Sequence, residues 1–417
     1  MTDPRRAIEA VWRIESARLI AGLARVTGDV GSAEDLAQDA LVAALQQWPE
    51  SGVPDKPGAW LMAVGRRRAI DQLRRQASLA RKRDELGREL EAKDRIARAE
   101  LGAPDDDIGD DLLRLIFVAC HPVLSPAARL ALTLRLLGGL TTDEIARALL
   151  VPEATVAQRI VRAKRTLSEA RVPFEVPPPN ELGLRLRSVL EVVYLIFNEG
   201  YAATAGDDWI RPGLCEEALR LGRMLAELVP SEPEVHGLVA LLELQASRLG
   251  ARLGPDGEPI LLADQDRGRW DPLLIRRGLA SLERAERLGE GLGPYGLQAE
   301  IAACHARARS VEATDWVRIT ALYDALAELA PSPIVDLNRA VAVGMAYGPE
   351  AGLERLDALA ETPSLATYHL LPSVRGDLLV KVGRLDEARA EFLRAASLTR
   401  NERERRLLEE RAARIAC

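Results

Sequence analysis

The chain of 417 residues is poor in the residue types on which several classes of protein depend. Aromatic residues make up only 4% of it, and it contains four histidines and four cysteines. The cysteines are far apart and form no CxxC pair, so neither a disulfide framework nor a structural zinc site is expected. Cys120-His121 and Cys304-His305 are adjacent pairs, but neighbouring helical residues point about 100° apart and make a poor ligand set. We therefore expect no metal and no cofactor.

Other sequence features are also missing. The chain has no run of about twenty apolar residues, and its first residues lack the continuous apolar core of a signal peptide. It has no glycine-rich phosphate loop and no nucleophile–base cluster of the kind that catalysis requires. These absences argue against a membrane protein and against an enzyme. We expect a cytoplasmic protein without a catalytic site of its own.

The residues that are abundant favour helices. Hydrophobic residues make up 47% of the chain and charged residues 29%, and alanine, leucine, arginine and glutamate dominate. Because these are strong helix formers, an all-α fold is predicted. The net charge of −7 argues against nucleic-acid binding over the whole surface. It leaves room for a local basic face, because charge asymmetry along a chain matters more than the sum.

Charge changes sign abruptly near the first fifth of the chain. Residues 55–83 hold nine Lys or Arg against two Asp, whereas residues 84–111 hold eleven Asp or Glu against four Lys or Arg. The acidic stretch ends in a segment with almost no apolar residues. We therefore predict a flexible acidic linker over residues 79–111. A proline-rich boundary is expected at residues 172–180.

Residues 140–167 have the pattern of a helix-turn-helix unit. Thr141 or Thr142 is predicted to cap the first helix, with Glu144 at the capping-box position. Ile145, Ala146 and Leu149 should face Val156 and Ile160 of the second helix. Candidates for contact with base edges are Thr155, Gln158 and Arg159, and candidates for contact with phosphates are Arg162, Lys164 and Arg165. The alternative is a solvated basic helix in a bundle.

Two helices are predicted before the acidic linker. The first covers residues 33–48, with Ser32 as its N-cap and Leu36, Ala40, Ala43 and Ala44 on its inner face. A loop is expected at residues 49–58 because of its prolines and glycines. The second helix, residues 59–75, is basic toward its end, and its candidate DNA-binding residues are Arg66, Arg67, Asp71, Arg74 and Arg75. A solvent-exposed charge run is the alternative.

The end of the chain shows signs of a repeat. Gly376, Ala388, Phe392 and Ala395 have the spacing of the small and large packing positions in a tetratricopeptide unit, a pair of helices in about 34 residues. Stacked helix pairs leave a concave surface that suits partner binding. An irregular helical domain is the alternative.

Three segments in order give the sequence a family resemblance: AEDLAQDALVAALQQW, GAWLMAVGRRRAIDQLRR and LTTDEIARALLVPEATVAQRIVRAKRTL. Together they resemble the two conserved regions of sigma-70 family RNA polymerase sigma factors of the extracytoplasmic-function type. The C-terminal part resembles the subgroup with a tetratricopeptide-like extension. The resemblance implies four segments: region 2 at residues 8–78, the acidic linker at 79–111, region 4 at 112–171, and the helical extension at 180–417.

The resemblance also implies partners. Asp35, Gln38 and Asp39 share one helix face and would bind core RNA polymerase at its clamp, with the flap as a further contact. The basic helix would bind the minus-ten promoter element and help to open it, and the helix-turn-helix would read the minus-thirty-five element. The acidic linker would mimic nucleic acid in the RNA path, or serve only as a solubilising tether. The extension would regulate or support activity and is expected to have a protein or small-molecule partner.

A rival interpretation is a helix-turn-helix transcriptional activator with a tetratricopeptide-like sensor domain. Such an activator would bind DNA without polymerase and would need neither the Asp35 face nor the basic segment at residues 55–83. The N-terminal region therefore discriminates between the two functions.

Overall fold

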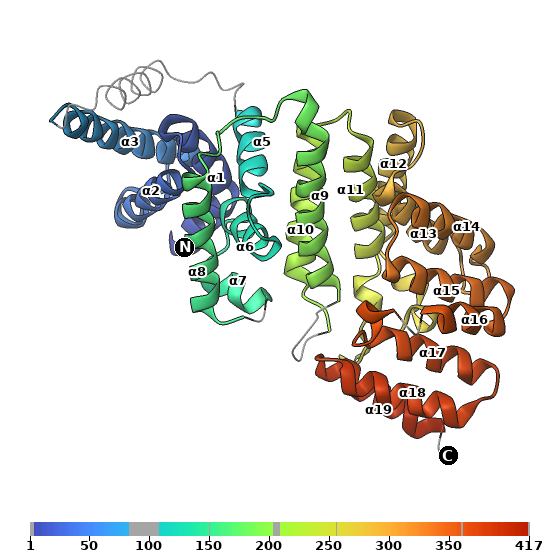
Figure 1. Cartoon of the computed structure of the whole chain (residues 1–417). Helices are drawn as coiled ribbons and strands as arrows, with labels where there is room; N and C mark the ends of the chain where they lie inside the picture. Colours follow the sequence, from blue (N-terminus) through green and yellow to red (C-terminus); the bar gives the residue numbers. More distant parts are fainter. Residues whose placement is uncertain are drawn as a thin grey trace. The chain divides into compact units, whose positions relative to one another are not determined.

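A computed structural model of the chain is drawn in Figure 1. It describes residues 4–82, 108–149, 151–202, 209–255, 257–359 and 362–415. Within these ranges the regular elements are helices, and isolated bridge residues include the antiparallel pair Leu253 and Pro259. The predicted all-α fold is confirmed. None of the described helices is both long and apolar enough to cross a lipid bilayer.

The chain forms two compact units, residues 1–195 and 196–417. The helices of the first unit are α1 (Pro4–Thr27), α2 (Val30–Ser51), α3 (Pro57–Lys82), α5 (Ile108–Ala119), α6 (Pro126–Leu136), α7 (Thr142–Leu149), α8 (Glu153–Glu169) and the first part of α9 (Pro179–Tyr201). α1 packs against α2 and α3 and also against α5 and α6. Its Leu19, Ile20 and Leu23 are almost fully buried. The segments before and after the acidic stretch therefore share one core.

The boundaries of α2 differ from those predicted. Asp29, not Ser32, is the N-cap, because its carboxylate accepts a hydrogen bond from the Ser32 N–H at 2.7 Å. The helix also continues through Pro49 to Ser51, and Gly52 follows as its C-cap with a φ of +82° that suits glycine. The predicted loop is thus shorter, since α3 already begins at Pro57. The predicted inner face is confirmed: Leu36, Ala40, Ala43 and Ala44 are buried.

The predicted acidic linker is helical at both of its ends. α3 extends to Lys82 and α5 begins at Ile108, while residues 83–107 lie outside the described residues. Asp111, predicted to lie in the linker, is buried in the first turn of α5. Its carboxylate pairs with Arg25 of α1 at 3.1 Å and with Arg114 at 2.7 Å. The last predicted linker residues are therefore structural.

Helix α9 contributes to both units, because the division falls at residues 195 and 196. Its first turns are bonded to the region around α5 and α6. Arg185 donates to the Phe117 carbonyl at 2.9 Å, and the Ser188 hydroxyl donates to the Cys120 carbonyl at 2.7 Å. Arg129 of α6 forms an ion pair with Glu191 at 3.0 Å. The extension is predicted to start at residue 180, but the first turns of α9 after that residue pack with the first unit.

The second unit continues with α10 (Pro212–Leu228), α11 (Pro233–Ala246), α12 (Pro272–Leu288), α13 (Pro294–Arg307), α14 (Trp316–Leu329), α15 (Pro333–Tyr347), α16 (Pro349–Leu359), α17 (Leu370–Lys381), α18 (Leu385–Leu398) and α19 (Glu402–Ile415). Many of these helices begin with proline, whose missing N–H costs nothing in a first turn. Short 3₁₀ helices follow α11: η2 (Leu249–Ala251), η3 (Leu262–Asp264) and η4 (Arg267–Arg269).

The residues that predicted a tetratricopeptide-like helix pair meet in α17 and α18. Ala388, Phe392 and Ala395 are at most 1% exposed. A Cβ placed on Gly376 would lie 2.7 Å from the Phe392 ring, so only glycine allows this approach. Gly383 makes the turn between the two helices at a φ of +77°.

Candidate nucleic-acid interface

Helix α2 carries the face that the sequence assigns to polymerase binding. Asp35 and Asp39 are exposed, and the Asp35 side chain is 78% exposed. Gln38 is half-buried and donates from Nε2 to a Glu34 Oε1 at 2.7 Å. Asp39 lies 3.3 Å from an Arg68 nitrogen of α3. The three predicted residues therefore lie on one side of α2, and the carboxylates of Asp35 and Asp39 are exposed there.

Helix α3 carries the basic face. Arg67, Arg74 and Arg75 are exposed, and Arg66 is half-buried. Asp71 lies 3.9 Å from Arg74, as the predicted arrangement of an aspartate among arginines requires. At the start of the helix, Trp60 meets Trp48 edge to face with ring centres 5.2 Å apart. This aromatic contact fixes α3 against the end of α2.

The helix-turn-helix forms as the sequence predicts. The Glu144 N–H donates to the Thr141 hydroxyl at 3.1 Å, and the Thr141 N–H donates to the Glu144 carboxylate at 2.8 Å. Thr141 is therefore the cap of α7 and completes a capping box. Ile145 and Ala146 of α7 and Val156 and Ile160 of α8 are buried.

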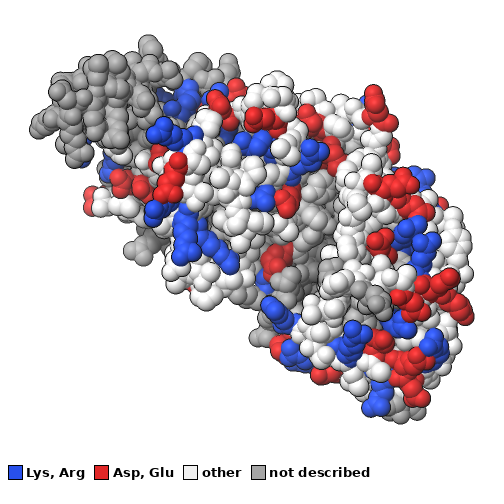
Figure 2. Space-filling view, viewed as in Figure 1, with Lys and Arg blue, Asp and Glu red and all other residues white. Residues whose placement is uncertain are grey.

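The predicted DNA-binding residues of α8 lie away from this small core. Gln158, Arg162 and Arg165 are exposed, whereas Thr155, Arg159 and Lys164 are half-buried. In Figure 2 a group of Lys and Arg side chains gathers over α8. Arg165 is held by Glu169 one turn later, with its Nε 2.6 Å from the carboxylate. Arg162 and Arg165 are thus the exposed cationic residues among the predicted DNA contacts of α8.

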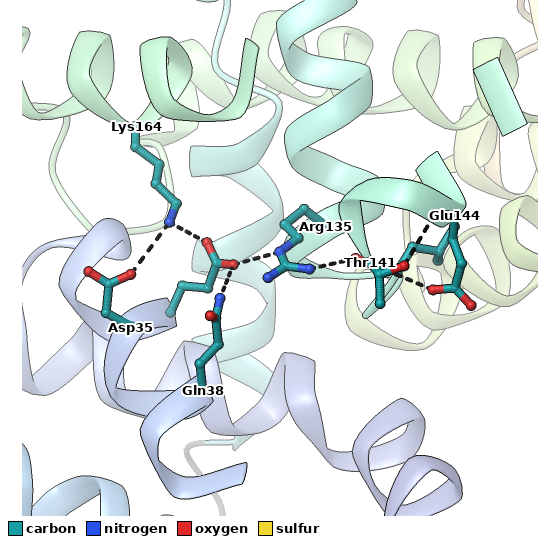
Figure 3. A network of polar contacts seen from close by, with 8 residues as sticks. Asp35, Gln38, Arg135, Thr141, Glu144 and Lys164 are labelled. Atoms are coloured by element: carbon teal, nitrogen blue, oxygen red, sulfur yellow. Dashed lines mark hydrogen bonds and ion pairs between the residues drawn. The ribbon is translucent and has the colours of Figure 1, made fainter. Parts of the chain in front are cut away.

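One cationic residue of α8 points into the protein instead. Lys164 forms an ion pair with Glu34 of α2 and lies 3.9 Å from an Asp35 oxygen (Figure 3). Glu34 is 3% exposed and also accepts a hydrogen bond from Arg135 Nε of α6 at 2.6 Å. Arg135 in turn donates to the Leu140 carbonyl just before α7 at 3.0 Å. A candidate DNA contact and a candidate polymerase contact are therefore joined through one buried carboxylate.

The pKa of Glu34 reflects its surroundings. Burial acts to raise it, but Lys164 and Arg135 outweigh burial and hold the pKa below its ordinary value of 4.5. Glu34 is consequently ionised at neutral pH, so the contact between α2, α6 and α8 joins a carboxylate to two cations.

A second contact joins the same two halves of the first unit. Arg13 of α1 lies 3.1 Å from Glu144, the residue that completes the capping box of α7. Its guanidinium is 71% exposed, so this ion pair contributes little by itself. The buried contacts at Glu34 and Asp111 are the stronger connections.

Glu34, Arg135 and Asp111 were not among the predicted site residues. The sequence does contain a signal for Glu34, because it is a charged residue next to the apolar positions Ala33 and Ala37 of the buried face of α2. Neither cysteine–histidine pair belongs to a group of three or more described residues that could hold a metal ion. The Cys120 thiol contacts the Thr133 hydroxyl at 3.4 Å in the core, where burial raises its pKa to about 11.

Comparison with known families agrees with this geometry. Residues 14–79 match sigma-70 region 2, and residues 114–167 match sigma-70 region 4. Residues 185–286 match a family of unknown function. The region 2 match covers α2 and α3, the part of the chain that a simple helix-turn-helix activator does not need. It therefore favours a sigma factor over the activator.

Similar proteins agree as well. An uncharacterized protein of Rhizobium meliloti is 45% identical over 385 residues, which is 91% of this chain and 89% of that protein. The probable ECF RNA polymerase sigma factor SigI of Mycobacterium tuberculosis is 31% identical over 41% of this chain and 58% of SigI. The ECF RNA polymerase sigma factor SigL of the same species is 33% identical over 34% of this chain and 76% of SigL. The chain thus belongs to the sigma-70 family as an extracytoplasmic-function RNA polymerase sigma factor, acting in promoter recognition and transcription initiation, with a helical C-terminal extension.

Proposed function

We propose that the three candidate surfaces act together during initiation. The α2 face with Asp35, Gln38 and Asp39 binds the clamp of core RNA polymerase, and region 4 contacts the flap. Helix α3 binds the minus-ten element, and helix α8 reads the minus-thirty-five element. The chain directs the polymerase to promoters and has no catalytic centre of its own.

The exposed carboxylates of α2 support the polymerase contact. Asp35 and Asp39 are one helical turn apart and project from a helix whose other side is buried. Such a rigid acidic face suits a basic partner surface, because its side chains need little reordering on binding.

The basic face of α3 supports binding to opened DNA. Arg67, Arg74 and Arg75 are exposed along one helix that the Trp48–Trp60 contact anchors. Unstacking a base costs a few kcal/mol, and phosphate contacts by such a row of arginines offset part of this cost. Arg66 and Asp71 complete the proposed surface.

The outer side of α8 supports duplex reading. Thr155, Gln158 and Arg159 lie in the first half of the helix, where recognition helices contact base edges. Arg162 and Arg165 lie further along and suit phosphates, which position the helix without selecting a sequence.

Lys164 gives the proposal a conformational requirement. In the arrangement that the structure shows, which we call closed, Lys164 is bound to Glu34 and lies 3.9 Å from an Asp35 oxygen, so α8 lies at the edge of the α2 face. A polymerase surface that takes Asp35 would compete with α8 for the same place. We propose that binding to polymerase separates region 4 from region 2, frees Lys164 for a phosphate and lets the two regions reach separate promoter elements.

The test is initiation by purified components. Start sites mapped with and without overproduction of the protein identify its promoters, and single-round transcription with core polymerase then measures initiation at them. Asp35→Ala should reduce core binding and transcription while duplex binding by region 4 persists. Gln47→Ala, an exposed change on another side of α2, should leave both unchanged. If the protein directs no specific initiation with core polymerase, the proposal fails.

A further inference from the structure

Buried positive charge gathers at one place in the second unit. Tyr201, Trp209, Arg248, Arg252 and Trp270 form what we call the arginine–aromatic cluster. They come from the end of α9, the segment before α10, the turns after α11 and the residue after η4. All five lie within residues 185–286, the part that matches a family of unknown function.

Each guanidinium of the cluster faces an aromatic ring. The Arg252 Cζ lies 3.8 Å from the centre of the Tyr201 ring and 5.7 Å from that of Trp209. The Arg248 Cζ lies 5.7 Å from the Tyr201 ring centre and 5.6 Å from that of Trp270. Arg248 also donates to the Tyr201 hydroxyl. The two arginines therefore share one ring and lie close to each other.

Among the described residues, no carboxylate forms an ion pair with the arginines of the cluster. Arg248 and Arg252 are each 9% exposed, and neither forms an ion pair with any residue of the described chain. Elsewhere in the same unit buried charge is paired. Glu243 binds Arg223 and Arg277, and Glu300 binds Arg307 and Arg318. The arginines of the cluster thus differ from these buried glutamates, each of which is paired with residues of opposite charge.

Arg248 also donates to the side-chain oxygen of Gln245, but neutral acceptors and aromatic rings do not fully compensate two buried cations. Removing an ion from water carries a penalty that persists even after the protein relaxes. A cation–π contact returns only part of that penalty. A guanidinium recovers more from a carboxylate or phosphate, which accepts two parallel hydrogen bonds.

The cluster also holds donors that no described residue uses. The Arg252 Nε and the indole nitrogens of Trp209 and Trp270 are buried without a hydrogen-bond acceptor. Trp270 is 4% exposed. These unused N–H groups lie beside guanidiniums that pair with no described carboxylate, and an oxyanion requires such donors.

Neighbouring groups report a positive local potential. Burial lowers the pKa of Arg252; Tyr201 acts to raise it, and the nearby Arg248 acts to lower it. Burial, with Arg248 and Arg267, lowers the pKa of His305 to about 3. Arg267 itself is anchored, because it donates to the carbonyls of His305 and Ala308 at 2.7 Å each. The histidine beside the cluster is therefore neutral at physiological pH and adds no charge.

We propose that the arginine–aromatic cluster binds an oxyanion, the phosphate or carboxylate group of a small molecule. Arg252 and Arg248 supply the charge, and the indole N–H groups supply further hydrogen bonds. The extension would then be a ligand-binding domain attached to the promoter-binding part of the chain.

The experiment titrates the full chain with inorganic phosphate and, separately, with citrate. Sodium chloride at matched ionic strength serves as the control. Trp209 and Trp270 lie in the cluster, so tryptophan fluorescence measures the dissociation constant, and thermal unfolding provides a second readout. At least one anion should give a saturable fluorescence change. At a hundred times its dissociation constant it should raise the unfolding temperature of the second unit by about 5–10 °C.

Three variants test the assignment. Arg252→Gln should weaken the anion's binding about tenfold to a hundredfold, as expected for a charged hydrogen bond. Arg252→Lys keeps the charge but loses the planar pair of donors, so it should weaken binding less than Arg252→Gln does. It also controls for a loss of binding that is caused by misfolding of Arg252→Gln. Arg276→Gln removes an exposed arginine of α12 in the same unit and should bind like the parent.

The outcomes separate the proposal from its rivals. Preference for phosphate or for citrate identifies the class of oxyanion. No saturable effect from either, or equal effects in Arg252→Gln and Arg276→Gln, would overturn the proposal. Asp207 and Asp208 lie outside the described residues, so the double variant Asp207→Asn/Asp208→Asn is included. If saturable binding arises only in that variant, the chain's own aspartates are the counter-ions and the proposal is wrong.

Discussion

The Glu34 carboxylate lies 2.6 Å from the Arg135 guanidinium, although the two residues are 101 positions apart in the sequence. With Lys164 as a third member, this contact connects α2 of region 2 with α6 and α8 of region 4. Glu34 is almost fully buried, so the contact depends on the two regions being closed together. Separation of the two regions must therefore break this contact.

Glu34→Gln should therefore shift the first unit toward an open arrangement. The amide cannot balance Arg135 and Lys164, and a hydrogen bond to a charged group is worth about 1.5–3 kcal/mol. The closed population should fall about tenfold to a hundredfold relative to the open one. Energy transfer between dyes at Gln47→Cys in α2 and Ser168→Cys in α8 measures the separation. Cys120, Cys215 and Cys304 are buried and should react little. Cys417 would be replaced by serine.

Glu50→Gln is the matched control, because it removes an exposed carboxylate from the same helix. Its energy transfer should equal that of the parent. A Glu34→Gln protein with unchanged transfer would show that the buried carboxylate does not hold the regions together.

Closure should depend on pH in one direction. The pKa of Glu34 is below 4.5 in the closed arrangement. Its contribution is therefore fully present above pH 4.5 and is lost as the pH falls through the lowered value. Energy transfer should be constant between pH 6 and 8 and fall only in acid. The Glu34→Gln variant should lack this part of the acid response, and an identical acid response in both proteins would count against Glu34 as the responsible group.

Two substitutions on α8 should affect DNA binding differently. Arg159→Ala should reduce discrimination among upstream promoter bases, by about 1–3 kcal/mol at the position it reads. Arg165→Ala should weaken binding to all sequences alike and reduce the salt dependence of binding by about one unit of slope. Binding assays with the promoter and with base-substituted duplexes at several salt concentrations separate these effects. Equal behaviour of the two variants would refute the division into base and phosphate contacts.

A substitution in the extension tests its packing. Gly376→Ala should destabilise the α17–α18 pair, because the new methyl group would lie 2.7 Å from the buried Phe392 ring. Overpacking of this kind costs about 1–3 kcal/mol, against about 1 kcal/mol gained in helix propensity. Gly213→Ala in α10 is the control, since no atom lies within 4 Å of its added Cβ. Thermal unfolding should show a lower midpoint for Gly376→Ala only.

Features set by neighbouring residues could be predicted from the sequence. The capping box of Thr141 and Glu144 and the inner faces of α2 and α8 formed as expected, because both depend on residues three or four positions apart. The Gly376–Phe392 approach was also detectable through its spacing. The cap of α2 was misplaced because Asp29 and Ser32 are both good caps, and only the backbone decides between them.

Features set by distant residues could not be predicted. Asp111 was assigned to the acidic linker by its charge, but Arg25, far earlier in the chain, gives it a buried partner. The basic helix predicts a phosphate contact for Lys164, whereas its pairing with Glu34 requires the two regions to meet. Local patterns locate a charged residue on its helix, whereas its partner is fixed by tertiary packing.

The central claim is that α2 can contact either α8 or the polymerase, but not both. The most direct measurement is energy transfer between the dyes at Gln47→Cys and Ser168→Cys as purified core RNA polymerase is added. We expect transfer to fall with polymerase concentration, and Glu34→Gln to bind polymerase more tightly than Glu50→Gln does. Full binding of polymerase with undiminished transfer would contradict the account.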